Sequence, residues 1–223
     1  MISCIMGAMS AKYPPPPHLI YGYRWVIAKD LRGILKSDRD NAAGEHLIGY
    51  PYVDHTNGLS MHVRLFCAVD SSGGIQPTAD LNSQRIMLIV RYDVLETCEI
   101  TLLSTEQISA LQLPSEPESL QSYRNPDVEP LRQIDYMHPL RAPGFPDDIK
   151  FVLPPRQAGQ NPEQVWGRLE RQIDPHHFEC ELLVQPHQDL GMNWGDRVLV
   201  RVRPTPQGVE SLCVGKRTEG NAP

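Results

Sequence analysis

The chain of 223 residues is long enough for one large domain or two small ones, each with a hydrophobic core. Its hydrophobic and charged fractions, 40% and 22%, are typical of a soluble globular protein. A formal net charge of -6 and only 7% aromatic residues do not suit the cationic surface and exposed rings that nucleic-acid binding usually requires, which argues against nucleic acid as a partner.

Four consecutive prolines at positions 14–17 favour polyproline II, which predicts an extended N-terminal segment over residues 1–17. Residues 1–11 are apolar but lack the basic start and apolar core of a signal peptide. No apolar run approaches the roughly 18 residues that suggest a membrane span. We therefore expect a cytoplasmic protein that does not contact a membrane.

Residues 18–145 are predicted to form an α+β domain, mostly an antiparallel sheet with a few short helices. Apolar residues alternate with polar ones over 61–69, which predicts a half-buried strand. Residues 70–83 are expected to be a long loop, and the continuously apolar stretch 86–90 a central strand that is covered on both faces. A further strand is expected over 98–103.

A short helix is predicted to follow that strand and to extend to about Leu113. Ser104 or Thr105 is a suitable N-cap, and Glu106 in the first turn favours the helix dipole. The next segment, up to Pro146, is rich in proline and should be irregular, with short helices after Ser115 and near Val128. We place the domain boundary at its end, between residues 145 and 146.

Residues 146–216 are predicted to form a small antiparallel β barrel or sandwich, followed by a tail over 217–223. Three stretches in this module place apolar residues on one face of a strand. They are Val165, Gly167 and Leu169; Phe178, Cys180, Leu182 and Val184; and Val198, Val200 and Val202.

No motif for a cofactor, a metal or a nucleophile occurs, so we expect none of these. The five cysteines are odd in number and widely spaced, which predicts free thiols. Two histidine-containing sets have the residue types of a metal site, but we expect surface turn histidines in the first set, and the second lacks the His-Glu-x-x-His spacing. These sets are His176, His177, Cys180, His187 and Asp189, and His46, Asp54, His55 and His62.

Paired carboxylates could support glycosidase chemistry only if they faced each other across a cleft. Asp147 and Asp148 are adjacent and follow Gly-Phe-Pro, which predicts a turn in which one of them bonds local amides. Glu179 and Glu181 share a face of one strand, and the alternation places that face towards solvent.

The C-terminal third has Glu163 followed three residues later by Trp166, then the apolar strand 178–184, Pro186, and finally Gly-Asp-Arg-Val at 195–198. This pattern resembles the YegJ-like family of small bacterial domains of unknown function. Upstream, the stretch 143–151 resembles the proline–aspartate turn of several immunity-like bacterial proteins. Such domains often accompany polymorphic toxin systems, so the resemblance implies an inhibitory role through binding.

Three functional hypotheses follow. The first is a non-enzymatic cytosolic protein that binds another protein, such as an immunity protein bound to a toxin domain. Its contacts would be Glu116, Glu118, Asp127, Glu129, Asp135 and Trp194.

The second hypothesis is an enzyme of unrecognised type with its site in the cleft between the two domains, where ligand sites are common. Its candidate residues are His138, Arg141, Asp147, His176 and His187. The third is a nucleic-acid-binding β barrel that uses a basic strip of Arg197, Arg201 and Arg203.

Overall fold

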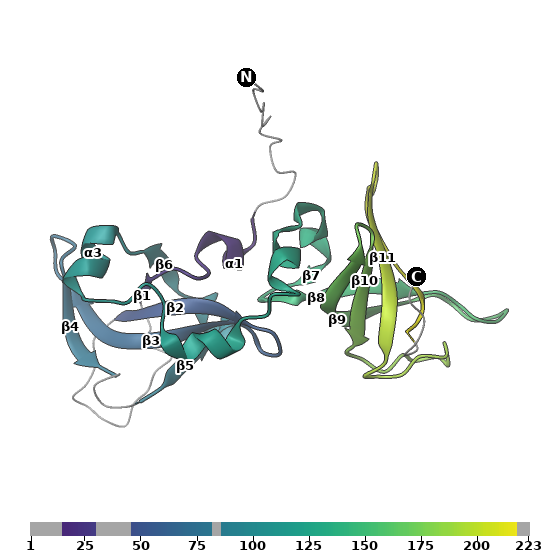
Figure 1. The fold of residues 1–223 in the computed structure, drawn as a ribbon, viewed down its shortest axis with the longest axis horizontal. Coiled ribbons are helices and arrows are strands. Elements are labelled where there is room, and N and C mark those ends of the chain that lie inside the picture. Colours follow the sequence, from purple (N-terminus) through teal and green to yellow (C-terminus); the bar gives the residue numbers. More distant parts are fainter. Residues whose placement is uncertain (1–14, 30–45, 82–85, 218–223) are drawn as a thin grey trace, which may run out of the picture.

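A computed structural model of the chain describes residues 15–29, 46–81 and 86–217. The extended segment expected over 1–17 therefore lies outside the described residues up to residue 14, and the expected tail lies outside them from residue 218. Two β structures lie at opposite ends of the described chain, with short helices between them (Figure 1). No helix among the described residues is long and apolar enough to cross a membrane.

The first β structure is a six-stranded antiparallel sheet in the order β4-β3-β2-β1-β6, with β5 paired to β3 beside β4. Its strands are β1 (Val26–Lys29), β2 (His46–Asp54), β3 (Gly58–Val69), β4 (Ile75–Asp80), β5 (Leu88–Arg91) and β6 (Glu99–Leu102). Both faces of this sheet are covered. Trp25, Ile48 and Tyr50 pack on one face with Leu113 and Leu120, whereas Val26 and Leu47 pack on the other face.

Two expectations for this domain are confirmed. Residues 61–69 lie in β3 with alternating burial, and Ser104 begins α3 (Thr105–Ala110) with a capping box in which Ser104 and Gln107 exchange hydrogen bonds. Two expectations are wrong. Residues 70–83 contain β4. The stretch 86–90 is no central strand, because Ile86 and Met87 are exposed and β5 pairs with no strand other than β3 in the described part of the chain. Strand β3 is long enough to pair with β5 along one half and with β4 along the other.

Three 3₁₀ helices connect the sheet to the second β structure: η2 (Glu118–Tyr123), η3 (Glu129–Gln133) and η4 (Asp135–Leu140). Short helices were expected in this region, and proline keeps them short: Pro117 precedes η2, Pro130 lies in the first turn of η3, and Pro139 lies inside η4. Leu131, Met137 and Leu140 precede the expected boundary at 145/146, yet they pack in the core of the second β structure.

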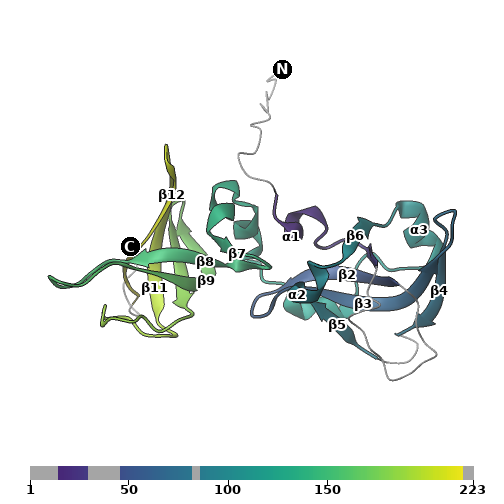
Figure 2. The same ribbon diagram turned by 180° about the vertical axis from the view of Figure 1, so that it is seen from behind.

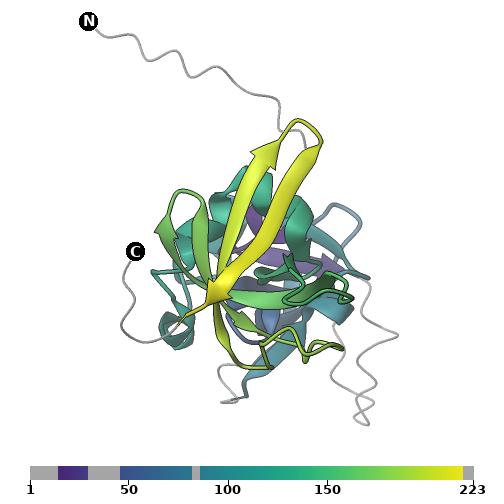
Figure 3. The same cartoon turned by 90° about the vertical axis from the view of Figure 1, so that its right-hand side faces the viewer.

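The second β structure contains a closed barrel of five strands (Figures 2 and 3). Its strands, with the short β7 at one end, are β7 (Arg141–Ala142), β8 (Phe145–Leu153), β9 (Glu163–Asp174), β10 (His177–Leu182), β11 (Arg197–Thr205) and β12 (Gly208–Lys216). Sequential neighbours pair antiparallel, and a parallel contact between Leu212 of β12 and Val152 of β8 closes the barrel. This sequential order differs from the Greek-key order of OB-fold barrels.

The alternating residues of β9, β10 and β11 fill the barrel interior, as the sequence predicts. Phe178, Cys180 and Leu182 are fully buried, and so are Val198, Val200 and Val202. Because successive side chains of a strand point to opposite faces, closing the sheet places every second residue in one shared core.

We expect Phe178→Ala to lower the free energy of unfolding by about 3–5 kcal/mol, because it leaves a cavity in a core that cannot fully collapse. Urea denaturation followed by circular dichroism measures this loss. The control is Val214→Ala on the outer side of β12, where the side chain is 44% exposed. Equal losses for the two variants would contradict a packed barrel interior.

Candidate functional site

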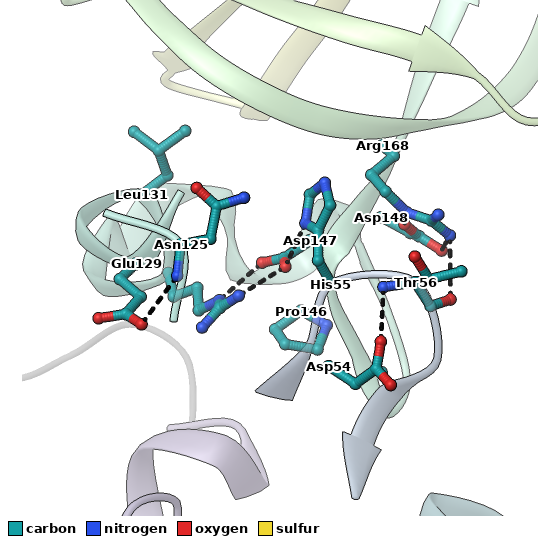
Figure 4. A network of polar contacts seen from close by, with 12 residues as sticks. Asp54, His55, Thr56, Asn125, Glu129, Leu131, Pro146, Asp147, Asp148 and Arg168 are labelled. Atoms are coloured by element: carbon teal, nitrogen blue, oxygen red, sulfur yellow. Dashed lines mark hydrogen bonds and ion pairs between the residues drawn. The ribbon is translucent and has the colours of Figure 1, made fainter. Parts of the chain in front are cut away.

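The turn between β2 and β3 is the point where the first sheet meets the barrel (Figure 4). Asp54 Oδ1 accepts hydrogen bonds from the backbone amides of Thr56 and Asn57, which fixes the turn. The amide of Leu59 donates to the carbonyl of Gly144, beside β8. Gly58 has φ +74°, and a Cβ there would lie 2.4 Å from the same carbonyl oxygen, so only glycine permits this close approach.

Asp147 of β8 is the centre of the polar network at this junction. Arg132 of η3 binds it with two parallel hydrogen bonds of 2.7 Å, from Nε to Oδ1 and from Nη2 to Oδ2. His55 Nδ1 lies 2.9 Å from Oδ2. Asp147 and Arg132 are each 2% exposed. Burial alone would raise the pKa of Asp147, but the hydrogen bonds from Arg132 and His55 outweigh it and hold this pKa below its usual value.

His55 brings a second carboxylate, Glu170, into the network. Its contact with Asp147, followed by that with Glu170, raises the pKa of His55 to about 9, so the imidazole carries a positive charge at neutral pH. The distance from His55 Nε2 to Glu170 Oε1 is 3.6 Å, which is an ion-pair distance but too long for a hydrogen bond. Arg197 Nη1 approaches the same Glu170 oxygen at 2.9 Å and extends the network across the outside of the barrel.

The expectation that Asp147 and Asp148 lie in a turn and bond local amides is wrong. Both belong to β8, and their partners are distant in sequence. Arg168 of β9 donates from Nε to Asp148 Oδ1 at 2.9 Å and from Nη2 to the carbonyl of Thr56 at 3.3 Å. Burial raises the pKa of Asp148 despite the charge of Arg168. Nothing in the local sequence identifies these arginines as partners, so no local signal predicts the network.

A cavity of about 220 Å³ lies beside this junction, between the first sheet and the barrel. Leu59 of β3 and Tyr92 of α2 (Tyr92–Leu95) line it from the first sheet, and Pro146 of β8 lines it from the barrel. Its polar lining consists of His18 from α1 (Pro17–Ile20), His138 from η4 and Arg141 from β7. The cavity thus lies in the cleft where the second hypothesis expects a site.

The polar groups of this cavity are a buried cation and two uncharged imidazoles. Arg141 is 9% exposed and donates to the carbonyl of Leu131 at 2.5 Å and to the carbonyl of Pro146. Burial lowers the pKa of Arg141 to about 10. Burial and the charge of Arg141 lower the pKa of His18 to about 3, and the same two causes lower that of His138. The two imidazole rings lie edge to face, with centroids 6.4 Å apart.

The structure brings together three of the five cleft candidates. His138 and Arg141 line the cavity, and Asp147 lies next to it in the ion-pair network. His176 and His187 lie apart, in turns of the barrel, where their amides donate to Asp174 and Glu163 respectively. His18 completes the lining of the cavity, but the sequence analysis did not identify it. No motif marks the stretch around His18, and only the fold brings this residue to the cavity.

The acidic candidates of the first hypothesis divide into two groups. Arg124 binds Glu116 and Glu129, with its guanidinium 4.3 Å from the centre of the Tyr23 ring. The others, Glu118, Asp127 and Asp135, are exposed on the connecting segment. Trp194 is 68% exposed and lies apart from them in sequence, in the β10–β11 connection of the barrel.

The expected basic strip of the barrel is paired with carboxylates. Arg197 binds Glu170 and Glu181, while Arg201 and Arg203 both bind Glu210. Within the described ranges, no three of the His, Cys, Asp and Glu side chains are grouped so that they could hold a metal ion.

Comparisons of the chain with family models, with curated proteins and with solved structures found no match. The resemblance to the YegJ-like family therefore remains a prediction from the residues that carry it.

We expect Asp147→Asn to lower the free energy of unfolding by about 3–5 kcal/mol, because it leaves the buried charge of Arg132 uncompensated. Urea denaturation at neutral pH measures the effect. The control is Asp93→Asn, which neutralises an exposed carboxylate on α2. A loss no greater than that of the control would show that the pair does not hold the junction.

Because His55 is protonated in the folded protein, we expect the free energy of unfolding to decrease at alkaline pH. Its pKa is about 9 in the folded protein, against an ordinary value of 6.5. Its contribution to stability is therefore complete below pH 6.5 and is lost as the pH rises to about 9. We expect the free energy of unfolding to fall over this range in the wild type and to fall less in His55→Gln. Parallel pH profiles from denaturant titrations of both proteins would contradict this assignment.

Proposed function

We propose that this protein is a non-enzymatic binding protein of the cytoplasm that neutralises a bacterial toxin domain by direct contact, as immunity proteins do. The observation that carries the proposal is a set of three exposed carboxylates along the connecting segment, which we call its acidic surface. Glu118, Asp127 and Asp135 project there, on and between the short helices that join the two β structures. Their negative charge suits a basic partner, whose association it would accelerate by electrostatic steering.

The acidic surface lies on a segment that is fixed at both ends. Leu120 packs in the core of the first sheet, and Leu131 packs in the core of the barrel. Between them, Arg124 joins Glu116 to Glu129 and stacks on Tyr23. A segment held in this way loses little conformational entropy when a partner binds, which favours tight association.

Trp194 supplies a second type of contact. Its side chain is largely exposed in a barrel loop, where Gln185 Oε1 accepts a hydrogen bond from its backbone amide. Tryptophan is enriched among the residues that dominate the binding energy of protein interfaces. The ion pairs of Arg197, Arg201 and Arg203 argue against a nucleic acid as the partner, because phosphate groups would have to compete with the carboxylates that already bind these arginines. A protein partner is therefore favoured.

An enzyme that acts in the cleft is the second candidate function, and one observation favours it. His138 and Arg141 line the same cavity as His18, and imidazoles beside a guanidinium are common in sites that bind and transform anions. Turnover of a substrate that is abolished by His138→Ala would favour this candidate over the first.

The first test is co-expression of the full chain with the toxin domain encoded next to its gene. We expect protection of the host cell and a complex of the two purified proteins. The double variant Glu118→Lys/Asp127→Lys should lower the association rate constant about tenfold or more at low salt, because it reverses the steering charge. Stopped-flow or biolayer interferometry at two salt concentrations measures this effect.

Asp93→Lys is the control, because it reverses one exposed acidic charge on α2, outside the connecting segment. We expect it to leave the association rate close to that of the wild type. Absence of both protection and complex formation would overturn the proposed function. An equal loss of rate in the control and in the double variant would instead reject the connecting segment as the contact surface.

A further inference from the structure

Arg141 differs from the other buried arginine beside the cleft in having no carboxylate partner. Arg132 is neutralised by two hydrogen bonds to Asp147. Arg141 donates only to the backbone carbonyls of Leu131 and Pro146, and no ion pair joins it to a carboxylate in the described part of the chain. The charge of Asp147 raises the pKa of Arg141 without an ion pair between the two side chains, since Arg132 binds both Asp147 oxygens and His55 lies against one of them.

A buried charge without a counterion is costly, since partial charges of carbonyl groups replace only part of the lost hydration. Arg141 Nε has no hydrogen-bond partner among the described residues, and neither has His18 Nε2 or His138 Nδ1. Three side chains that line this one cavity thus each have a nitrogen without a hydrogen-bond partner. Buried polar groups rarely lack a hydrogen-bond partner, unless a bound molecule or ion supplies one.

The lining of the cavity restricts what could bind there. Pro17, Leu59, Tyr92 and Pro146 supply apolar walls around the three polar side chains. The cavity volume, about 220 Å³, exceeds the space of a single water molecule. Mostly apolar walls with a few convergent polar groups are typical of sites for small organic molecules, whereas phosphate would leave the walls without a partner.

We propose that this cavity binds a small organic monocarboxylate, with its carboxylate beside Arg141, His18 and His138 and its short apolar body against Pro17, Leu59 and Tyr92. The carboxylate supplies the counterion that Arg141 lacks. It also favours the protonated form of an imidazole that could donate a hydrogen bond to it. The inference does not rest on the proposed function, because no acidic residue of the connecting segment lines the cavity, although His138 Nε2 lies 3.6 Å from Asp135 Oδ1.

The test is a titration of the full-length, ¹⁵N-labelled protein with sodium butyrate at constant ionic strength, followed by NMR of side-chain nitrogens. We expect saturable shifts of the His18 and His138 imidazoles and of Arg141 Nε. Butyramide, the neutral counterpart of butyrate, should bind about tenfold more weakly, because it lacks the charge. Sodium phosphate should give no saturable shift at these three side chains.

Two variants and a control complete the test. Arg141→Met should weaken butyrate binding about tenfold or more. Because Arg141 also holds two carbonyls, His138→Leu provides a variant that leaves those hydrogen bonds in place, and we expect it to weaken binding about threefold or more. His176→Gln, in an exposed turn of the barrel, should bind like the wild type.

Four outcomes would overturn the inference: shifts that do not saturate, equal binding of butyrate and butyramide, tighter binding of phosphate than of butyrate, or unchanged affinity in His138→Leu. None of these bears on the contact with a toxin domain, which is measured separately.

Discussion

The junction of the two β structures depends on one buried carboxylate. Asp147 lies on a barrel strand, Arg132 comes from the connecting helices and His55 comes from the turn of the first sheet, so three separate parts of the chain converge on it. Arg132 and Asp147 are both almost completely buried, and each would be costly to bury without the other. The pair therefore determines how the first sheet, the connecting segment and the barrel come together, and with that the position of every residue in the cleft.

The charges around this carboxylate fall into two classes. Arg132, Arg168 and Arg197 are each bound to a carboxylate, which satisfies them and gives them a structural role. Arg141 lies within the same junction but, among the described residues, its hydrogen bonds go to backbone carbonyls alone. Pairing with a carboxylate thus distinguishes the arginines of the structural network from the arginine of the candidate ligand site. The closeness of charged residues does not by itself indicate a functional site in this junction. Whether each charge is neutralised by a bonded partner is more informative.

The prolines of the connecting segment have two structural consequences: they anchor the segment in both cores and leave its carboxylates exposed. Proline keeps its helices short, so the segment bends back and forth and packs leucines into both cores. The same bends leave Glu118, Asp127 and Asp135 on the outside, where carboxylates are well hydrated. The connecting segment is therefore anchored in both cores and carries exposed carboxylates, where the sequence alone indicates an irregular linker between domains.

The sequence by itself determined the features that depend on near neighbours. Alternating apolar residues identify β3 and the barrel strands, and the spacing of Ser104 and Gln107 specifies the start of α3, because side-chain direction and capping depend on local backbone geometry. Only the tertiary structure decided that β5 pairs with β3, that β12 closes the barrel on β8, and that Asp147 contacts Arg132 and His55. It also placed His18 beside His138, 120 positions further along the chain. These contacts join residues far apart in sequence, and no local pattern encodes which distant partner satisfies a buried charge or completes a strand.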